Sequence, residues 1–151
     1  SGGYMIRILM GSESDREIME KSVSVFEKFG VKYEFEVISA HRDGERLREY
    51  ILKNEQNTEI FIAGAGLAAH LPGVIASMTC KPVIGVPLYS KYTGGVDSLY
   101  SIVQTPKGVP VSCVGIDNSI NAALQAIRIL CLNNRELEEK YKDFMKNGSK
   151  I

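Results

Sequence analysis

Side chains that bind metals or form cross-links are scarce in this 151-residue chain, which has two histidines and three cysteines. Cys80, Cys113 and Cys131 are odd in number, lie in apolar surroundings and show no Cys-x-x-Cys spacing. We therefore expect reduced thiols in the core rather than disulfides. So few scattered ligands also argue against a structural zinc site, and we expect no metal.

An excess of either charge is also missing, because eighteen basic side chains balance eighteen acidic ones. The balance argues against nucleic acid or an anionic membrane as a partner. No apolar run approaches the roughly 20 residues of a membrane span, and the start lacks the regions of a signal peptide. We therefore predict a cytoplasmic protein. Residues 1–4 look like an expression scar, which leaves one domain over residues 5–151.

Strand patterns alternate with helix patterns along the chain. The expected strands are residues 6–10, 31–37, 60–62, 82–86 and 109–116, and the expected helices are 14–29, 43–53, 74–78, 96–104, 118–130 and 135–146. This alternation predicts an α/β fold, a three-layer αβα sandwich with a parallel five-stranded sheet. Charged and apolar residues alternate over 31–37, which indicates an edge strand and hence the flavodoxin-like order 2-1-3-4-5 with an extra C-terminal helix.

Three local signals set element ends. Ser14 and Glu17 have capping-box spacing, Gly30 is typical of the residue after a helix, and Asn118 or Ser119 suits a helix start. Leu137, Tyr141 and Phe144 form an apolar stripe in the last helix. We expect residues 135–147 to pack on another subunit, although the stripe could instead cover the chain's own sheet edge.

Ligands of such sheets bind beyond the carboxyl ends of the strands, which groups four loops: 11–15, 39–42, 63–70 and 88–95. The hydroxyls and free N–H groups of 11–15 suit a phosphate, and Asp15 can accept from ribose hydroxyls. This loop matches neither a Walker A motif nor Gly-x-Gly-x-x-Gly, which disfavours an NTPase or a dinucleotide enzyme. His41 is a candidate general acid or base, and Arg42 can hold a phosphate or carboxylate.

Residues 63–70 form a small-residue segment in which glycine and alanine allow close approach to the backbone. Taken alone, the segment favours a tight turn that needs glycine only for its geometry. The neighbouring loops favour a ligand.

Five stretches together resemble a known family: Gly11–Asp15, Ser39–Arg42, Ala63–Gly73, Val83–Pro87 and Gly95–Gln104. From about Ile6 to Leu130 the chain resembles the class I N5-carboxyaminoimidazole ribonucleotide mutases, of the phosphoribosylaminoimidazole carboxylase catalytic subunit family. The resemblance implies an isomerase of purine biosynthesis that forms 4-carboxy-5-aminoimidazole ribonucleotide without a metal or any other cofactor. It also implies a homo-octamer with shared sites, and N5-carboxyaminoimidazole ribonucleotide synthetase as a pathway neighbour.

On matching positions, the resemblance implies that His41 is the catalytic acid and base, with His70 as the rival for that role. Ser12, Ser14 and Asp15 would hold the ribose phosphate with help from Arg42. The base and carboxylate end would be lined by Ser39, Ala40, Ala65, Gly66, His70 and Leu71.

Two alternatives stay open at this point. A class II enzyme would carboxylate aminoimidazole ribonucleotide directly, although Ala68–Gly73 resembles class I. A non-catalytic module that binds a phosphoribosyl ligand would also fit the fold. The chain departs from the usual family pattern at Leu67, where glycine is common, at Asp43-Gly44 and in a shortened segment 116–121.

Overall fold

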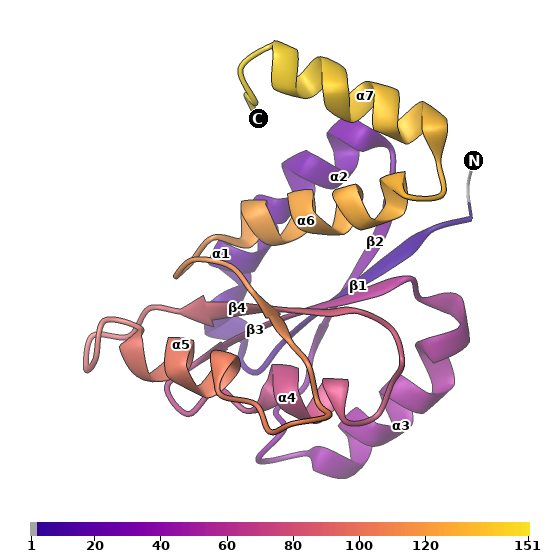
Figure 1. The fold of residues 1–151 in the computed structure, drawn as a ribbon. Coiled ribbons are helices and arrows are strands. Elements are labelled where there is room, and N and C mark those ends of the chain that lie inside the picture. The colour runs from indigo at the N-terminus through magenta and orange to yellow at the C-terminus, as the bar shows by residue number, and fades with distance from the viewer. Residues whose placement is uncertain (1–2) are drawn as a thin grey trace.

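Five parallel strands form one sheet in the computed structural model, which describes residues 3–151 (Figure 1). The strands are β1 (Met5–Met10), β2 (Lys32–Val37), β3 (Ile60–Gly66), β4 (Val83–Leu88) and β5 (Ser112–Cys113). Their order is β2-β1-β3-β4-β5, as the sequence predicts. Residues 1–2 of the expected expression scar lie outside the described residues.

Helices cover both faces of the sheet, which confirms the three-layer arrangement (Figure 1). On one face lie α1 (Arg16–Met19), α2 (Val23–Phe29) and α6 (Ser119–Cys131), with α7 (Arg135–Lys146) packed outside them. On the other lie α3 (Gly44–Asn54), α4 (Leu71–Ala76) and α5 (Val96–Val103). Short 3-10 turns occupy Glu13–Asp15, Glu20–Ser22 and Glu55–Asn57. No helix within residues 3–151 is long and apolar enough to cross a membrane.

The sheet separates two apolar cores because successive strand residues point to opposite faces. Ile8 and Ile62 belong to the core under α2 and α6, whereas Leu9 and Phe61 belong to the core under α3 and α4. All four side chains are fully buried. This burial places β1 and β3 at the centre of the sheet and holds their carboxyl ends in a fixed position.

The predicted first helix begins earlier than expected and contains a tight turn. Ser12, not Ser14, provides the cap: its Oγ accepts the Ser14 N–H at 3.3 Å. Asp15 makes no side-chain capping bond either. Farther along, hydroxyls of Ser22 and Ser119 donate to the carbonyls of Met19 and Ile18, both at 2.6 Å. These bonds accompany the 3-10 turn between α1 and α2, and Gly30 ends α2 with a φ of 68° as predicted.

Strand β3 is longer than predicted, because Ala63 to Gly66 continue the ladder and pair with β4. A Cβ on Gly64 would collide with the buried Met19 side chain of α1. The small residue at Gly64 therefore lets a helix of this chain approach the sheet, rather than a ligand. Helix α4 correspondingly starts at Leu71, with Pro72 in its first turn.

Strand β5 is shorter than the expected 109–116, because only Ser112 and Cys113 pair with β4. Pro110 has no N–H to donate to a ladder. Asn118 caps α6 as predicted, since its side chain accepts the Asn121 N–H at 3.0 Å.

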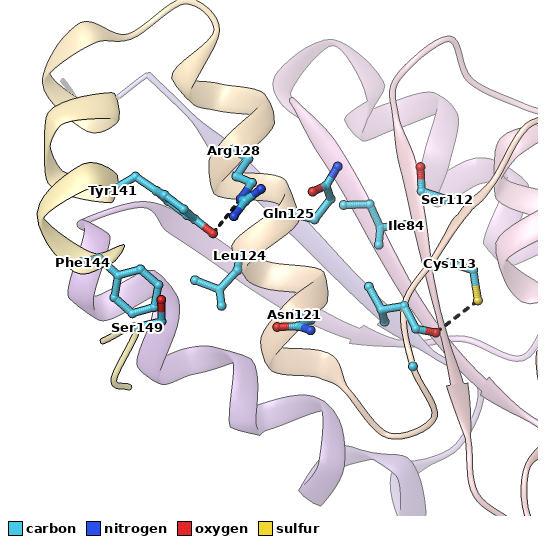
Figure 2. A pocket seen from close by; sticks show the side chains of 12 residues that line it. Ile84, Ser112, Cys113, Asn121, Leu124, Gln125, Arg128, Tyr141, Phe144 and Ser149 are labelled. Atoms are coloured by element: carbon cyan, nitrogen blue, oxygen red, sulfur yellow. Dashed lines mark hydrogen bonds between the residues drawn. The ribbon is translucent and has the colours of Figure 1, made fainter. Parts of the chain in front are cut away.

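The apolar stripe of α7 packs within its own chain. The ring centroids of Tyr141 and Phe144 lie 5.6 and 5.5 Å from that of Phe29 in α2. Arg128 Nε in α6 donates to the Tyr141 hydroxyl at 2.9 Å, and Figure 2 shows both residues. The stripe therefore packs on α2 and α6 of its own chain, and subunit packing by residues 135–147 stays a prediction.

The three cysteines are free, as expected, but Cys80 is exposed rather than buried. It lies in the turn between α4 and β4, outside both cores. Cys113 and Cys131 are partly buried, and burial raises the pKa of each thiol.

Candidate active site

The four predicted loops meet because the strands that precede them end in register. Met10 of β1 pairs with Val37 and with Gly64, and Gly66 of β3 pairs with Leu88. Beyond these ends lies a cleft of about 450 Å³. Every candidate residue lines it, namely Ser12, Ser14, Asp15, Ser39, Ala40, His41, Arg42, Ala65, Gly66, His70 and Leu71. Their individual roles stay predictions.

Five further residues line the cleft without having been assigned there from the sequence: Gly11, Leu67, Ala68, Tyr89 and Ser90. The first three belong to loops that supplied other candidates. Tyr89 and Ser90 directly follow β4 and belong to loop 88–95, which the rule on the carboxyl ends of strands groups with this site, although no candidate residue was chosen from that loop.

The loop after β1 presents hydroxyls to the cleft. The Oγ atoms of Ser12 and Ser14 lie 3.0 Å apart. Because neither the Ser14 hydroxyl nor the Asp15 carboxylate caps the helix, both remain available to a ligand. Burial raises the pKa of the Asp15 carboxyl; its bond with Ser12 opposes this shift, and the negative charge of Asp117 adds to it.

The same cleft also presents two imidazoles in contact. His41 Nε2 lies 2.6 Å from His70 Nδ1, and the rings are perpendicular. His41 belongs to the turn after β2, in which Ser39 Oγ accepts the Arg42 N–H at 3.2 Å. His70 immediately precedes α4. One ring must donate and the other accept, so a single proton lies between them.

The segment between β3 and His70 is held in an uncommon backbone conformation. Leu67 has a φ of 54°, in the left-handed region, and its side chain is 46% exposed. A Cβ in this region costs roughly 1–2 kcal/mol. The strained residue lies on the cleft wall, three positions before His70.

The loop after β4 contributes Tyr89 and Ser90 to the cleft, beside the end of β3, and forms the lip of the cleft there. Asp117 Oδ1 accepts the Tyr89 N–H at 2.9 Å. Ser90 and Thr93 Oγ atoms lie 3.2 Å apart, and the Gly94 N–H donates to the Ser90 carbonyl at 2.8 Å. The loop is thus closed on itself and tied to the segment before α6.

Two other hollows differ from this cleft in the residues that line them. A groove of about 460 Å³ between β5, α6 and α7, drawn in Figure 2, contains none of the candidate residues. A hollow of about 440 Å³ between α4 and α5 includes His70 and Ala69. Within residues 3–151, no three His, Cys, Asp or Glu side chains are grouped so that they could hold a metal ion.

The family model described as AIR carboxylase matches residues 5–150, nearly the whole chain. The chain belongs to the AIR carboxylase family. N5-carboxyaminoimidazole ribonucleotide mutase from Pyrococcus horikoshii is 54% identical over 144 residues, which cover 95% of this chain and 81% of that protein. The mutase from Aquifex aeolicus is 53% identical over 137 residues, covering 90% and 82%. The crystal structure of Treponema denticola PurE superposes with a TM-score of 0.89 at 30% identity, covering 96% of this chain and 91% of that one.

Within this AIR carboxylase fold, the cleft combines two capacities. Hydroxyls at a helix start can bind an anion, and an imidazole pair can transfer a proton. Small residues of β3, including Ala65 and Gly66, line the same cleft. The arrangement suits proton transfer on a small molecule that carries a phosphate.

Proposed function

We propose that this protein is an isomerase of de novo purine biosynthesis that converts N5-carboxyaminoimidazole ribonucleotide into 4-carboxy-5-aminoimidazole ribonucleotide. The observation that carries the proposal is the contact between His41 and His70, 2.6 Å apart, in a cleft that is also lined by the Ser12 and Ser14 hydroxyls. Membership of the AIR carboxylase family and curated relatives named as this mutase support it.

The substrate would lie along the cleft with its phosphate at the start of the first helical segment. Ser12 and Ser14 would donate to phosphate oxygens, and Asp15 would accept from ribose hydroxyls, with Arg42 adding a positive charge. The aminoimidazole would then lie beside Ser39, Ala40, Ala65, Gly66, His70 and Leu71. This placement brings the reacting ring to the imidazole pair.

The reaction requires one proton to be delivered and one to be removed. The carbamate C–N bond breaks, carbon dioxide leaves, and the nitrogen takes a proton from His41. The ring carbon then attacks carbon dioxide, forms a C–C bond and returns its own proton to His41. Because the imidazole ends in its starting state, no further acid, base or cofactor is needed. His70, which shares a proton with His41, would hold the imidazole in position during both transfers.

Carbon dioxide must stay beside the ring between the two steps. The apolar wall from Ala65 to Ala68 lies next to His70, and it offers no side-chain hydroxyl or amine that could capture the gas. Holding the gas against this wall would keep the recarboxylation intramolecular and raise its effective concentration.

We also propose a cytoplasmic homo-octamer in which neighbouring subunits complete the sites. Val96, Tyr100 and Val103 of α5 support an oligomer, because these apolar or aromatic residues are 46%, 61% and 47% exposed at helical spacing. The hollow between α4 and α5 is lined by His70, so it connects α5 with the imidazole pair. N5-carboxyaminoimidazole ribonucleotide synthetase would supply the substrate.

The decisive experiment compares two substrates. Fast conversion of N5-carboxyaminoimidazole ribonucleotide, with slow conversion of aminoimidazole ribonucleotide plus bicarbonate, would support the mutase. Equal or faster use of the second pair would assign the protein to the class II carboxylases. Ligand binding without turnover of either would leave a binding module.

A further inference from the structure

Asp117 lies outside the predicted site but holds the lip of the cleft at two points. Its N–H donates to the Pro87 carbonyl at 2.8 Å, and its Oδ1 accepts the Tyr89 N–H at 2.9 Å. One residue thus bonds the backbone on both sides of Leu88, at the last position of β4.

The bond to Tyr89 replaces strand pairing at a place where the sheet ends. Strand β5 stops at Cys113, so no neighbouring strand is available to the Tyr89 N–H. On the other flank, Ser98 Oγ of α5 donates to the Leu88 carbonyl at 3.0 Å. Two side chains from different elements therefore orient the backbone where the chain leaves the sheet and enters the cleft lip.

The backbone of Asp117 is strained in a way that this contact explains. Its φ is 60°, which non-glycine residues adopt rarely, although Asp and Asn tolerate it better than most. In this conformation its N–H and carboxylate both face the end of β4. A glycine would adopt the same φ more easily but could not accept from Tyr89.

We propose that Asp117 is a positioning residue for the isomerisation. Its carboxylate holds Tyr89 and Ser90 at the cleft mouth, so that the loop is ordered before substrate binds. The role in catalysis rests on the proposed function, whereas the hold on the loop does not. Removal of the carboxylate should therefore weaken substrate binding more than it slows the chemical step, because the loop must then be ordered at the expense of binding.

The test compares three variants by steady-state kinetics. Asp117→Gly keeps the backbone conformation but removes the acceptor, and we expect KM to rise about 5–10-fold with kcat changed less than about 2-fold, as for loss of one hydrogen bond. Asp117→Asn keeps an amide oxygen and should restore most of that loss. Asn118→Ala removes the neighbouring cap of α6 without touching Tyr89 and should leave KM unchanged. Equal KM values for Asp117→Gly and wild type would overturn the proposal.

Amide hydrogen exchange provides a readout that needs no turnover. In the wild type, the Tyr89 amide should exchange at least about 10-fold more slowly than that of Lys91, which makes no backbone hydrogen bond as a donor within residues 3–151. Asp117→Gly should abolish the difference, and Asp117→Asn should retain it. Fast exchange at Tyr89 in the wild type would overturn the proposal even if a variant failed to fold. An inactive wild type with a protected Tyr89 would instead contradict the proposed reaction and leave the hold on the loop intact.

Discussion

His41 Nε2 lies 2.6 Å from His70 Nδ1, although the two residues are 29 positions apart and follow different strands. Sequence reasoning treated them as rivals for one catalytic role. Their contact supports the proposal that they act as one proton-transfer unit instead, because a hydrogen bond between two imidazoles restricts the orientation and the tautomer of both rings. His41 would exchange protons with the substrate, and His70 would hold the imidazole of His41 in position.

Replacement of His41 by asparagine should lower kcat about 10²–10⁴-fold, the usual contribution of a positioned acid or base. His70→Asn should cost less, because a ring that can still exchange protons remains at position 41. The double variant should be no slower than His41→Asn, since groups that act as one unit are not additive. Steady-state kinetics with N5-carboxyaminoimidazole ribonucleotide checks the series, and additive losses would show two independent roles.

The serine pair should govern binding of the phosphate end. Ser12→Ala and Ser14→Ala should each raise KM about 10-fold, as for loss of a hydrogen bond to a charged group worth about 1.5 kcal/mol. Ser12→Ala should also lower stability slightly, because Ser12 caps the first helical segment. Ser24→Ala, on an exposed face of α2, is the matched control and should leave KM unchanged. A substrate analogue without the phosphate should bind equally to all of these variants.

Asp15 should make the protein less stable at neutral pH. Because burial raises the pKa of the folded-state carboxyl above its ordinary value of 3.8, the native state binds the proton more tightly than the unfolded chain. Stability from this group is therefore greatest at low pH and falls as the pH rises from 3.8 through the raised pKa. Asp15→Asn should melt at a higher temperature than wild type at pH 7, and the gain should shrink toward pH 3.8.

Asp15→Asn should weaken substrate binding although it stabilises the fold. Asp15→Asn should raise KM, because the amide accepts less strongly from ribose hydroxyls. Thermal unfolding at several pH values, together with kinetics at pH 7, measures both effects. A lower melting temperature at every pH would contradict the origin assigned to the raised pKa.

The left-handed backbone of Leu67 should lower the stability of the folded protein, while its side chain shapes the cleft wall. Glycine at this position removes the left-handed strain but loosens the unfolded chain, so Leu67→Gly should stabilise by about 0–1 kcal/mol. The melting temperature should rise by up to about 4 °C. The melting temperature of Leu67→Ala should not rise, because this variant keeps the backbone strain and loses side-chain contacts. If the leucine helps to hold carbon dioxide, Leu67→Gly should release more free aminoimidazole ribonucleotide per turnover.

Local patterns of the sequence were sufficient for the fold. Alternating charge over 31–37 identified the edge strand, the apolar runs of β3 and β4 identified the interior, and Gly30 and Asn118 marked helix ends. These features depend on neighbours along the chain, because side-chain periodicity and capping act over a few residues. The motif residues also predicted which loops would meet, since parallel strands align their carboxyl ends.

Tertiary packing decided the details that such patterns do not contain. Met19 of α1 occupies the space over Gly64, and the small residues after Ile62 pair with β4 and continue β3 instead of forming a loop. Ser12 rather than Ser14 caps the first helical segment. The contact of His41 with His70 joins residues 29 positions apart, and that of Asp117 with Tyr89 joins residues 28 positions apart. Nothing along the chain marks such pairs, because their distance follows from how helices and strands pack together. The sequence by itself determined the α/β fold and the residues that gather at its active edge, and the tertiary structure determined which of them touch.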